Sequence, residues 1–259
     1  MTALTLGVIG IALLVAGLLF GYGKVRDLYL EQCVIRDLAA QVEITSGRMV
    51  KADIVAAELG LLVGANLATL DLAQKRKALL DKVPNLLSVR ISRHLPDKVS
   101  VVTEERVPVA RLGLRASRRE TGRVVDAEGM VFIWQRGTQA LPVIREAQDP
   151  GTPRGHRIKG RTLAALRLIE AASEPEFAEL GILEVDLSKH DFLVATLGNY
   201  SKAKILWNGM DDPTPESAED LRRRLANLRN TIRTQLSPTT VIWNATIPNR
   251  IFADTQDKL

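Results

Sequence analysis

The sequence predicts an α+β protein with an N-terminal transmembrane helix, a unit of order β-α-α-β-β, and a mostly antiparallel β-domain with packed helices. Three observations lead to this prediction. The first 23 residues contain no charged side chain. Residues 40–112 place two helix-like segments between strand-like ones, and residues 113–259 contain mainly short alternating strands separated by turn residues. A chain of 259 residues is also long enough for two compact domains.

The composition is that of a globular protein, because 46% of the residues are apolar and 25% are charged. Aromatic residues make up only 4%, which argues against a nucleic-acid partner bound by stacked rings. The net charge is +5, and the basic residues are scattered among nearly as many acidic residues. A solvated surface is therefore favoured over a phosphate-binding patch. The single cysteine, Cys33, excludes an intramolecular disulfide.

Residues 1–23 predict an uncleaved transmembrane anchor, followed by a helical connector at residues 24–39. A helix needs about 20 mainly apolar residues to cross a hydrocarbon core of about 30 Å, and the uncharged segment provides them. A cleaved signal peptide would have a basic leader, a shorter apolar run and a cleavage site of small residues. Here the leader has no basic residue and only Gly21 and Gly23 resemble such a site, so we favour the anchor.

The charges beside this segment leave its orientation open. Lys24 and Arg26 follow the uncharged run and no basic residue precedes it; the positive-inside tendency alone would therefore keep the bulk of the chain in the cytoplasm. Asp27 and Glu31 nearly offset these charges, and long domains are translocated largely regardless of charge. A true start upstream of Met1 that adds a basic tail is a third explanation.

The first folded unit, residues 40–112, begins with a strand at residues 41–47, where apolar and polar residues alternate. A helix then begins near residue 51 and ends near Gly60 or Gly64. Its apolar face is predicted to consist of Ile54, Val55, Leu59 and Leu62.

A second helix follows, for which Asp71 is a good N-cap because Gln74 lies three residues later. Pro84 ends it, and residues 86–95 and 99–110 then alternate as two paired strands. We therefore expect two short helices on one face of a three-stranded sheet.

The second unit, residues 113–259, opens with a hairpin whose turn is Asp126–Gly129. Further short strands and a helix at residues 161–173 follow. Thr214 caps a long helix with Pro215 at its first position. The apolar stripe of this helix is Leu221, Leu225, Leu228, Ile232 and Leu236. A last strand at residues 239–247 runs into Pro248.

The residues that could carry catalysis do not form a known pattern. The three histidines, His94, His156 and His190, lack metal-ligand spacing, and no Gly-x-Ser-x-Gly elbow or phosphate loop is present in the sequence. We therefore expect no catalytic residues, metal site, cofactor or small-molecule substrate.

A series of motifs resembles the FtsQ/DivIB family of bacterial cell-division proteins. After the predicted anchor come Asp53-Ile54, Gly64-Ala65-Asn66-Leu67, Leu70-Asp71-Leu72, Val83-Pro84, Leu95-Pro96 and Glu105-Arg106-Val107-Pro108-Val109-Ala110. The resemblance implies that residues 40–112 are a POTRA domain and residues 113–259 an FtsQ-type β-domain.

The resemblance also implies a function. The protein would be a non-catalytic, single-pass scaffold of the divisome in the bacterial cytoplasmic (inner) membrane, at the division septum, with its bulk on the periplasmic side. It would bind partners of the FtsB and FtsL type through the far end of the β-domain. Two positions depart from the family: Val50 replaces a serine that caps the first POTRA helix, and residues 244–247 replace an Asp-Leu-Arg-Tyr-like run.

We expect these partners to bind by β-strand addition along the last predicted strand, because an unpaired strand edge presents free N–H and C=O groups. The candidate residues are Thr240, Val241, Ile242, Trp243, Asn244, Ala245, Thr246 and Ile247. Pro248 has no N–H and would end the pairing.

The stretch Glu105-Arg106-Val107-Pro108 is predicted to be the junction between the domains. Strict alternation places Glu105 among apolar neighbours unless a bulge intervenes. We therefore expect Glu105 and Arg106 to mark the end of the POTRA strand, with Pro108 protecting the edge.

Two other classes of protein remain open. A POTRA-bearing component of protein transport or secretion would carry tandem POTRA units and a membrane barrel, and the sequence indicates only one such unit. An envelope enzyme is disfavoured because no catalytic pattern is present.

Overall fold

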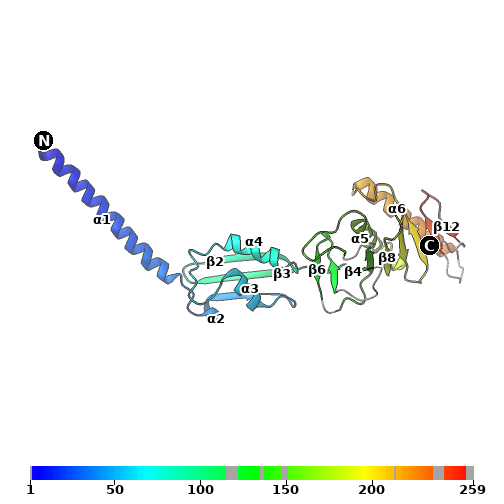
Figure 1. Ribbon diagram of the computed structural model, residues 1–259, viewed down its shortest axis with the longest axis horizontal. Helices are drawn as coiled ribbons and strands as arrows, with labels where there is room; N and C mark the ends of the chain where they lie inside the picture. The colour runs from blue at the N-terminus through cyan, green and yellow to red at the C-terminus, as the bar shows by residue number, and fades with distance from the viewer. Residues whose placement is uncertain are drawn as a thin grey trace. The chain divides into compact units, whose positions relative to one another are not determined.

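The structure is a computed structural model of the chain, and it describes residues 2–114, 122–134, 137–146, 151–212, 214–235 and 242–254. The chain divides into two compact units, Met1–Glu105 and Arg106–Leu259. Both mix helices with a β-sheet (Figure 1), as the α+β prediction requires.

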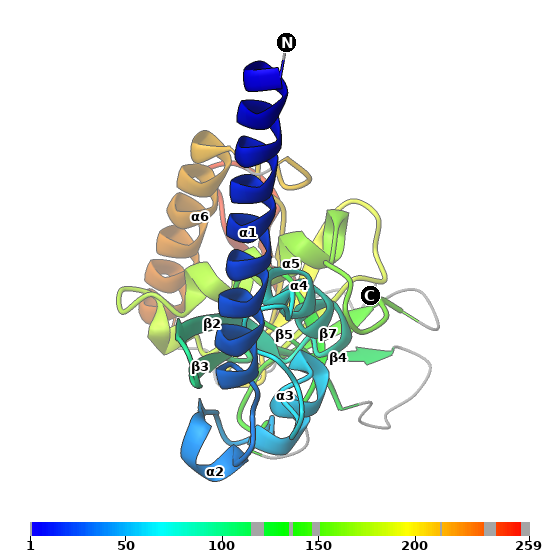
Figure 2. The same cartoon turned by 90° about the vertical axis from the view of Figure 1, so that its left-hand side faces the viewer.

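The first unit begins with α1 (Thr2–Gln32), a single helix that continues past the boundary expected at residue 23 (Figure 2). Within the part of the chain that the structure describes, no helix combines the length and the apolar composition of a membrane span. The end of α1 is bound to the rest of the first unit, because the Asn66 side-chain amide donates a hydrogen bond of 2.8 Å to the Leu30 carbonyl oxygen. Ile35 also donates its backbone N–H to the Ala65 carbonyl oxygen at 2.8 Å.

After α1 the predicted β-α-α-β-β order is present. The elements are α2 (Leu38–Gln41), β1 (Val42–Thr45), α3 (Ala52–Leu59), α4 (Leu72–Lys82), β2 (Leu86–His94) and β3 (Lys98–Glu105). The sheet order is β1-β3-β2, with β3 parallel to β1 and antiparallel to β2. Both helices contribute to the core of this unit, which includes Val55, Leu59 and Leu79 beside Val99 and Val101 of the central strand.

One detail of α3 differs from the prediction. Val55 and Leu59 are buried, but Ile54 is 44% exposed and Leu62 is 54% exposed. The helix ends at Leu59 because Gly60 adopts a left-handed conformation with φ of 73°. This reversal buries Leu61 in the core in place of Leu62. The predicted cap of α4 is confirmed, since the Gln74 N–H donates to an Asp71 carboxylate oxygen at 3.0 Å.

The second unit is built on one large sheet. Its elements are β4 (Ala110–Leu114), β5 (Arg123–Val125), β6 (Val131–Ile133), β7 (Val143–Glu146), α5 (Gly160–Ala172), η1 (Ala178–Leu180), β8 (Glu184–Asp186), β9 (Leu193–Thr196), β10 (Lys202–Ile205), α6 (Pro215–Thr234), β11 (Ile242–Ala245) and β12 (Phe252–Asp254). The strand order is β12-β11-β10-β9-β8-β7-β4-β5-β6. The pairs β4–β7, β7–β8 and β10–β11 are parallel and the other described pairs are antiparallel.

Helices α5 and α6 share the core of this unit with the strands. Of the stripe predicted for α6, Leu221, Leu225 and Leu228 are buried and Ile232 packs against the core, while Leu236 lies outside the described residues. The Thr214 hydroxyl accepts the Ser217 N–H at 3.2 Å, which confirms the predicted cap.

Candidate functional site

The Glu105 side chain binds the loop before α3. Its carboxylate accepts three backbone N–H groups, from Arg48 at 3.1 Å, Met49 at 2.8 Å and Val50 at 2.7 Å. Gly47 makes room for it, since a Cβ atom there would lie 2.2 Å from the Glu105 carboxyl carbon. The residue that sequence alternation placed among apolar neighbours therefore has polar partners, at the point where β3 ends.

The next residue, Arg106, binds within the second unit. Its guanidinium is 2.5 Å from the Asp126 carboxylate and 3.2 Å from that of Glu128. Arg106 and Asp126 are both buried, 9% and 5% exposed. Hydrogen bonds from Arg106 and from Arg157 lower the pKa of Glu128, so this carboxylate stays charged.

The segment between the two units is short. Val107 is 75% exposed, Pro108 is half-buried, and β4 begins at Ala110. In the last pairs of the first unit's sheet, the register of β2 against β3 shifts between Leu86 and Ser88. The structure therefore places Glu105, Arg106 and Pro108 at consecutive points of the passage from β3 to β4.

The predicted partner-binding strand lies in the interior of the sheet. Thr240 and Val241 fall outside the described residues. Residues 242–245 form β11, which pairs in parallel with β10 on one side and antiparallel with β12 on the other. Thr246 and Ile247 belong to the turn that follows. The backbone edge of β11 is consequently already occupied.

The strand that ends this side of the sheet is β12, which sequence reasoning missed. Among the described strands it pairs with β11 alone. Phe252 is 41% exposed and Ala253 is also exposed. The signal in the sequence is a short apolar run after Pro248-Asn249, where Asn249 adopts a left-handed φ of 58° and turns the chain back.

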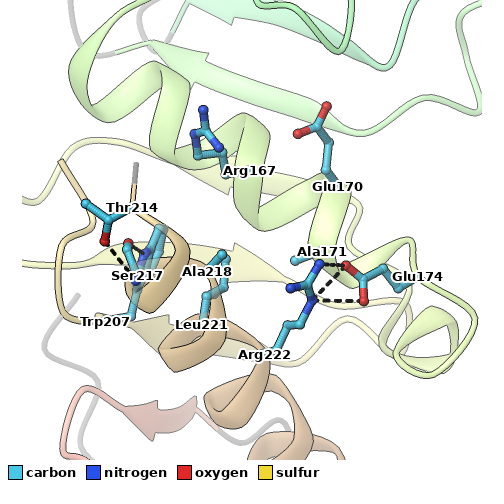
Figure 3. A pocket seen from close by; sticks show the side chains of 10 residues that line it. All are labelled: Arg167, Glu170, Ala171, Glu174, Trp207, Thr214, Ser217, Ala218, Leu221 and Arg222. Atoms are coloured by element: carbon cyan, nitrogen blue, oxygen red, sulfur yellow. Dashed lines mark hydrogen bonds and ion pairs between the residues drawn. The ribbon is translucent and has the colours of Figure 1, made fainter. Parts of the chain in front are cut away.

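A cavity of about 250 Å³ lies between α5 and α6 (Figure 3). Arg222 on α6 makes a bidentate pair with Glu174: its Nη2 donates to one carboxylate oxygen at 2.7 Å and its Nε to the other at 3.1 Å. Burial, with a smaller contribution from the Asp126 charge, raises the pKa of Glu170, and Arg167 opposes the shift. Glu170 lies on α5, Arg222 on α6 and Glu174 just after the end of α5. Among the described lining residues, the hydroxyl groups that could act as nucleophiles are those of Thr214 and Ser217.

The serine in this cavity, Ser217, has a structural role. Its hydroxyl donates to the Gly209 carbonyl oxygen at 2.7 Å and accepts the Trp207 indole N–H at 3.1 Å. No titratable base contacts it in these bonds, so it is not activated as a nucleophile. Over the described ranges, no group of three or more histidine, cysteine, aspartate or glutamate side chains could hold a metal ion.

Comparison with known proteins concerns the first unit. Residues 39–106 match the family model described as POTRA domain, FtsQ-type. Over 67 residues the chain is 40% identical to the cell division protein FtsQ of Neisseria meningitidis serogroup B, covering 26% of each protein. It is also 40% identical over 67 residues to the cell division protein FtsQ of Neisseria gonorrhoeae, covering 26% of this chain and 25% of that protein.

The matched segment spans about a quarter of the length of these relatives. It coincides with the β-α-α-β-β unit and ends at Arg106, one residue beyond β3. Residues 39–106 therefore match a POTRA domain of the FtsQ type, and over this domain the chain is similar to two cell division proteins FtsQ.

Proposed function

We propose that this protein is a non-catalytic scaffold of the bacterial divisome, anchored by a single helix in the cytoplasmic membrane with its bulk on the periplasmic side. The observation that carries the proposal is the FtsQ-type POTRA domain, at 40% identity to two proteins named cell division protein FtsQ. A large sheet whose last described strand has a free edge supports a role in binding other proteins.

The anchor is α1. Residues 1–23 carry no charge, and in the described part of the helix Leu18, Leu19 and Phe20 are 66%, 67% and 70% exposed. Large apolar side chains in such a row are stable in a lipid environment. Protease accessibility in spheroplasts tests the orientation: digestion of the folded units from outside supports it, and protection until the cells are lysed contradicts it.

The docking edge is β12. Because β11 is paired on both sides, partners of the FtsB and FtsL type would add a strand to β12 and not to residues 240–247. Proline substitutions at Phe252 and Ala253 test this, since N–H groups of successive residues point to opposite sides of a strand. One substitution removes a donor facing β11 and the other removes a donor facing outward.

The outward-facing variant should lose co-purification with the partner while the second unit stays folded. Unchanged binding in both variants, with intact folding, would contradict docking at β12. The cellular role is tested by depletion with imaging. Filamentous cells and midcell localisation support division, whereas normal septation with a diffuse envelope signal would overturn it.

A further inference from the structure

Helix α6 contains a buried ion pair whose contacts extend to the last strands of the sheet. Asp220 and Arg224 lie one helical turn apart, and each is only 7% exposed. The Arg224 Nε donates to the Asp220 carboxylate at 3.0 Å. Exposed pairs at this spacing contribute little to stability, but a buried charge that loses its partner is strongly destabilising. The stability of this pair therefore depends on the groups that surround it.

That environment consists of the ends of two neighbouring strands. The Arg224 Nη1 donates to the carbonyl oxygens of Ala245 and Thr246, both at 3.2 Å, at the end of β11. Asp220 accepts the backbone N–H of Asn208, beyond the end of β10, at 2.9 Å. Since β10 and β11 are parallel neighbours, the pair fixes α6 to the carboxyl ends of both.

The turn from β11 to β12 starts at these same carbonyl groups. The Asn244 side chain accepts the Thr246 N–H at 3.1 Å and its hydroxyl at 2.7 Å. Asn249 then reverses the chain into β12, where Asn244 pairs with Phe252. Arg224 thus holds the first residue of the turn that determines where β12 begins.

Apolar packing specifies the position of β12 only weakly. Ile251 packs against the core, but Phe252 and Ala253 are exposed. A strand without a buried face can slip in register. Hydrogen bonds at the preceding turn must therefore contribute much of what fixes the register of β12 against β11.

We propose that Arg224, oriented by Asp220, is a positioning residue for the docking edge: it holds the turn after β11 so that β12 presents its free backbone groups in one register. This inference rests on the proposed docking at β12. Arginine suits the role because its planar fork can bind a carboxylate and two carbonyl oxygens together, whereas a lysine ammonium is a single point of contact.

The test uses the full chain with Arg224→Lys, which keeps the charge, and Arg222→Lys as the matched control on the exposed face of the same helix. Hydrogen exchange is followed peptide by peptide, and affinity is measured with the partner identified by co-purification. We expect Arg224→Lys to accelerate exchange in β12 and to weaken partner binding by about tenfold, as for the loss of one charge-assisted hydrogen bond. Exchange in β8 and β9 should stay unchanged.

The outcomes separate this inference from the proposed function. If exchange accelerates uniformly across the unit, Arg224 is merely structural and the inference is wrong. If the proline variants of β12 abolish binding but Arg224→Lys binds normally, docking at β12 survives and the positioning role fails. If neither kind of variant affects binding, the proposed docking itself is overturned, and the inference with it. Asp220→Asn, which keeps the shape of the side chain, should reproduce the Arg224→Lys pattern in a weaker form.

Discussion

Glu105 and Arg106 are neighbours in the chain, yet each stabilises a different unit. Replacing either by alanine should therefore destabilise one unit and leave the other unchanged. The Glu105 carboxylate accepts N–H groups of the loop before α3 in the first unit, whereas the Arg106 guanidinium binds Asp126 in the second. This separation can be tested directly.

The two expected losses follow from the contacts. In Glu105→Ala three N–H groups lose a charged acceptor, and hydrogen bonds to charged groups contribute about 1.5–3 kcal/mol each. Because the N–H of Arg48 is in an exposed contact, water replaces part of this, and we expect the free energy of unfolding of the first unit to fall by about 3 kcal/mol. In Arg106→Ala the buried Asp126 is left without its cation, which should cost the second unit about 3–5 kcal/mol.

The two units can be followed separately by spectroscopy. Its three tryptophans, Trp134, Trp207 and Trp243, all lie in the second unit, so tryptophan fluorescence reports on that unit alone, whereas far-UV circular dichroism reports on both. In urea unfolding, Glu105→Ala should move a dichroism transition and leave the fluorescence midpoint in place, and Arg106→Ala should move the fluorescence midpoint. Glu104→Ala is the matched control, since Glu104 is exposed and bonded only to the Ser88 hydroxyl among its described contacts. A fluorescence shift in Glu105→Ala as large as its dichroism shift would refute the reasoning.

Three further predictions concern single side chains. Gly47→Ala should destabilise the first unit about as much as Glu105→Ala, because its Cβ would displace the Glu105 carboxylate, and the double variant should show little added loss. The raised pKa of Glu170 means that the folded state binds this proton more tightly than the unfolded chain, so stability falls as the pH rises from 4.5 through the raised value. Glu170→Gln should therefore raise the free energy of unfolding at pH 7 by less than about 1 kcal/mol and leave it unchanged near pH 4; an equal gain at both pH values would contradict this. Arg222→Ala, which removes an exposed pair with Glu174, should cost less than about 1 kcal/mol, and high salt should reduce the difference from the parent chain.

Features that depend on neighbouring residues were predictable from the sequence. The caps of α4 and α6 depend on side chains three residues from the N–H groups they bind, and the β-α-α-β-β order follows from local alternation and turn residues. The burial of Leu62 was predicted wrongly, because helical periodicity was extended beyond the point where Gly60 ends α3. One left-handed residue changes which side chain faces the core. The burial of Ile54, which lies within α3, was also predicted wrongly: the buried side chains of this helix are Val55 and Leu59, one turn apart.

Features that depend on distant pairing were not predictable. The partners of Glu105 lie 55 to 57 residues earlier in the chain, and the contact of Arg224 with Ala245 depends on how α6 packs against the sheet. The same holds for the proposed docking edge, because from the sequence β11 is the last recognisable strand, and the three-residue β12 pairs with it on the other side. Short strands carry too little pattern to be distinguished from loops.

Exchanging the two junction residues tests whether their order matters as the contacts require. The double variant Glu105→Arg with Arg106→Glu keeps composition and net charge. It would direct a cation at three N–H donors in the first unit and a carboxylate at Asp126 and Glu128 in the second. Like charges and unpaired donors are both destabilising, so the fluorescence and dichroism transitions should both move to lower urea. If either midpoint stays at the value of the unsubstituted chain, the stability that this signal reports depends on the net charge of the junction and not on these specific contacts.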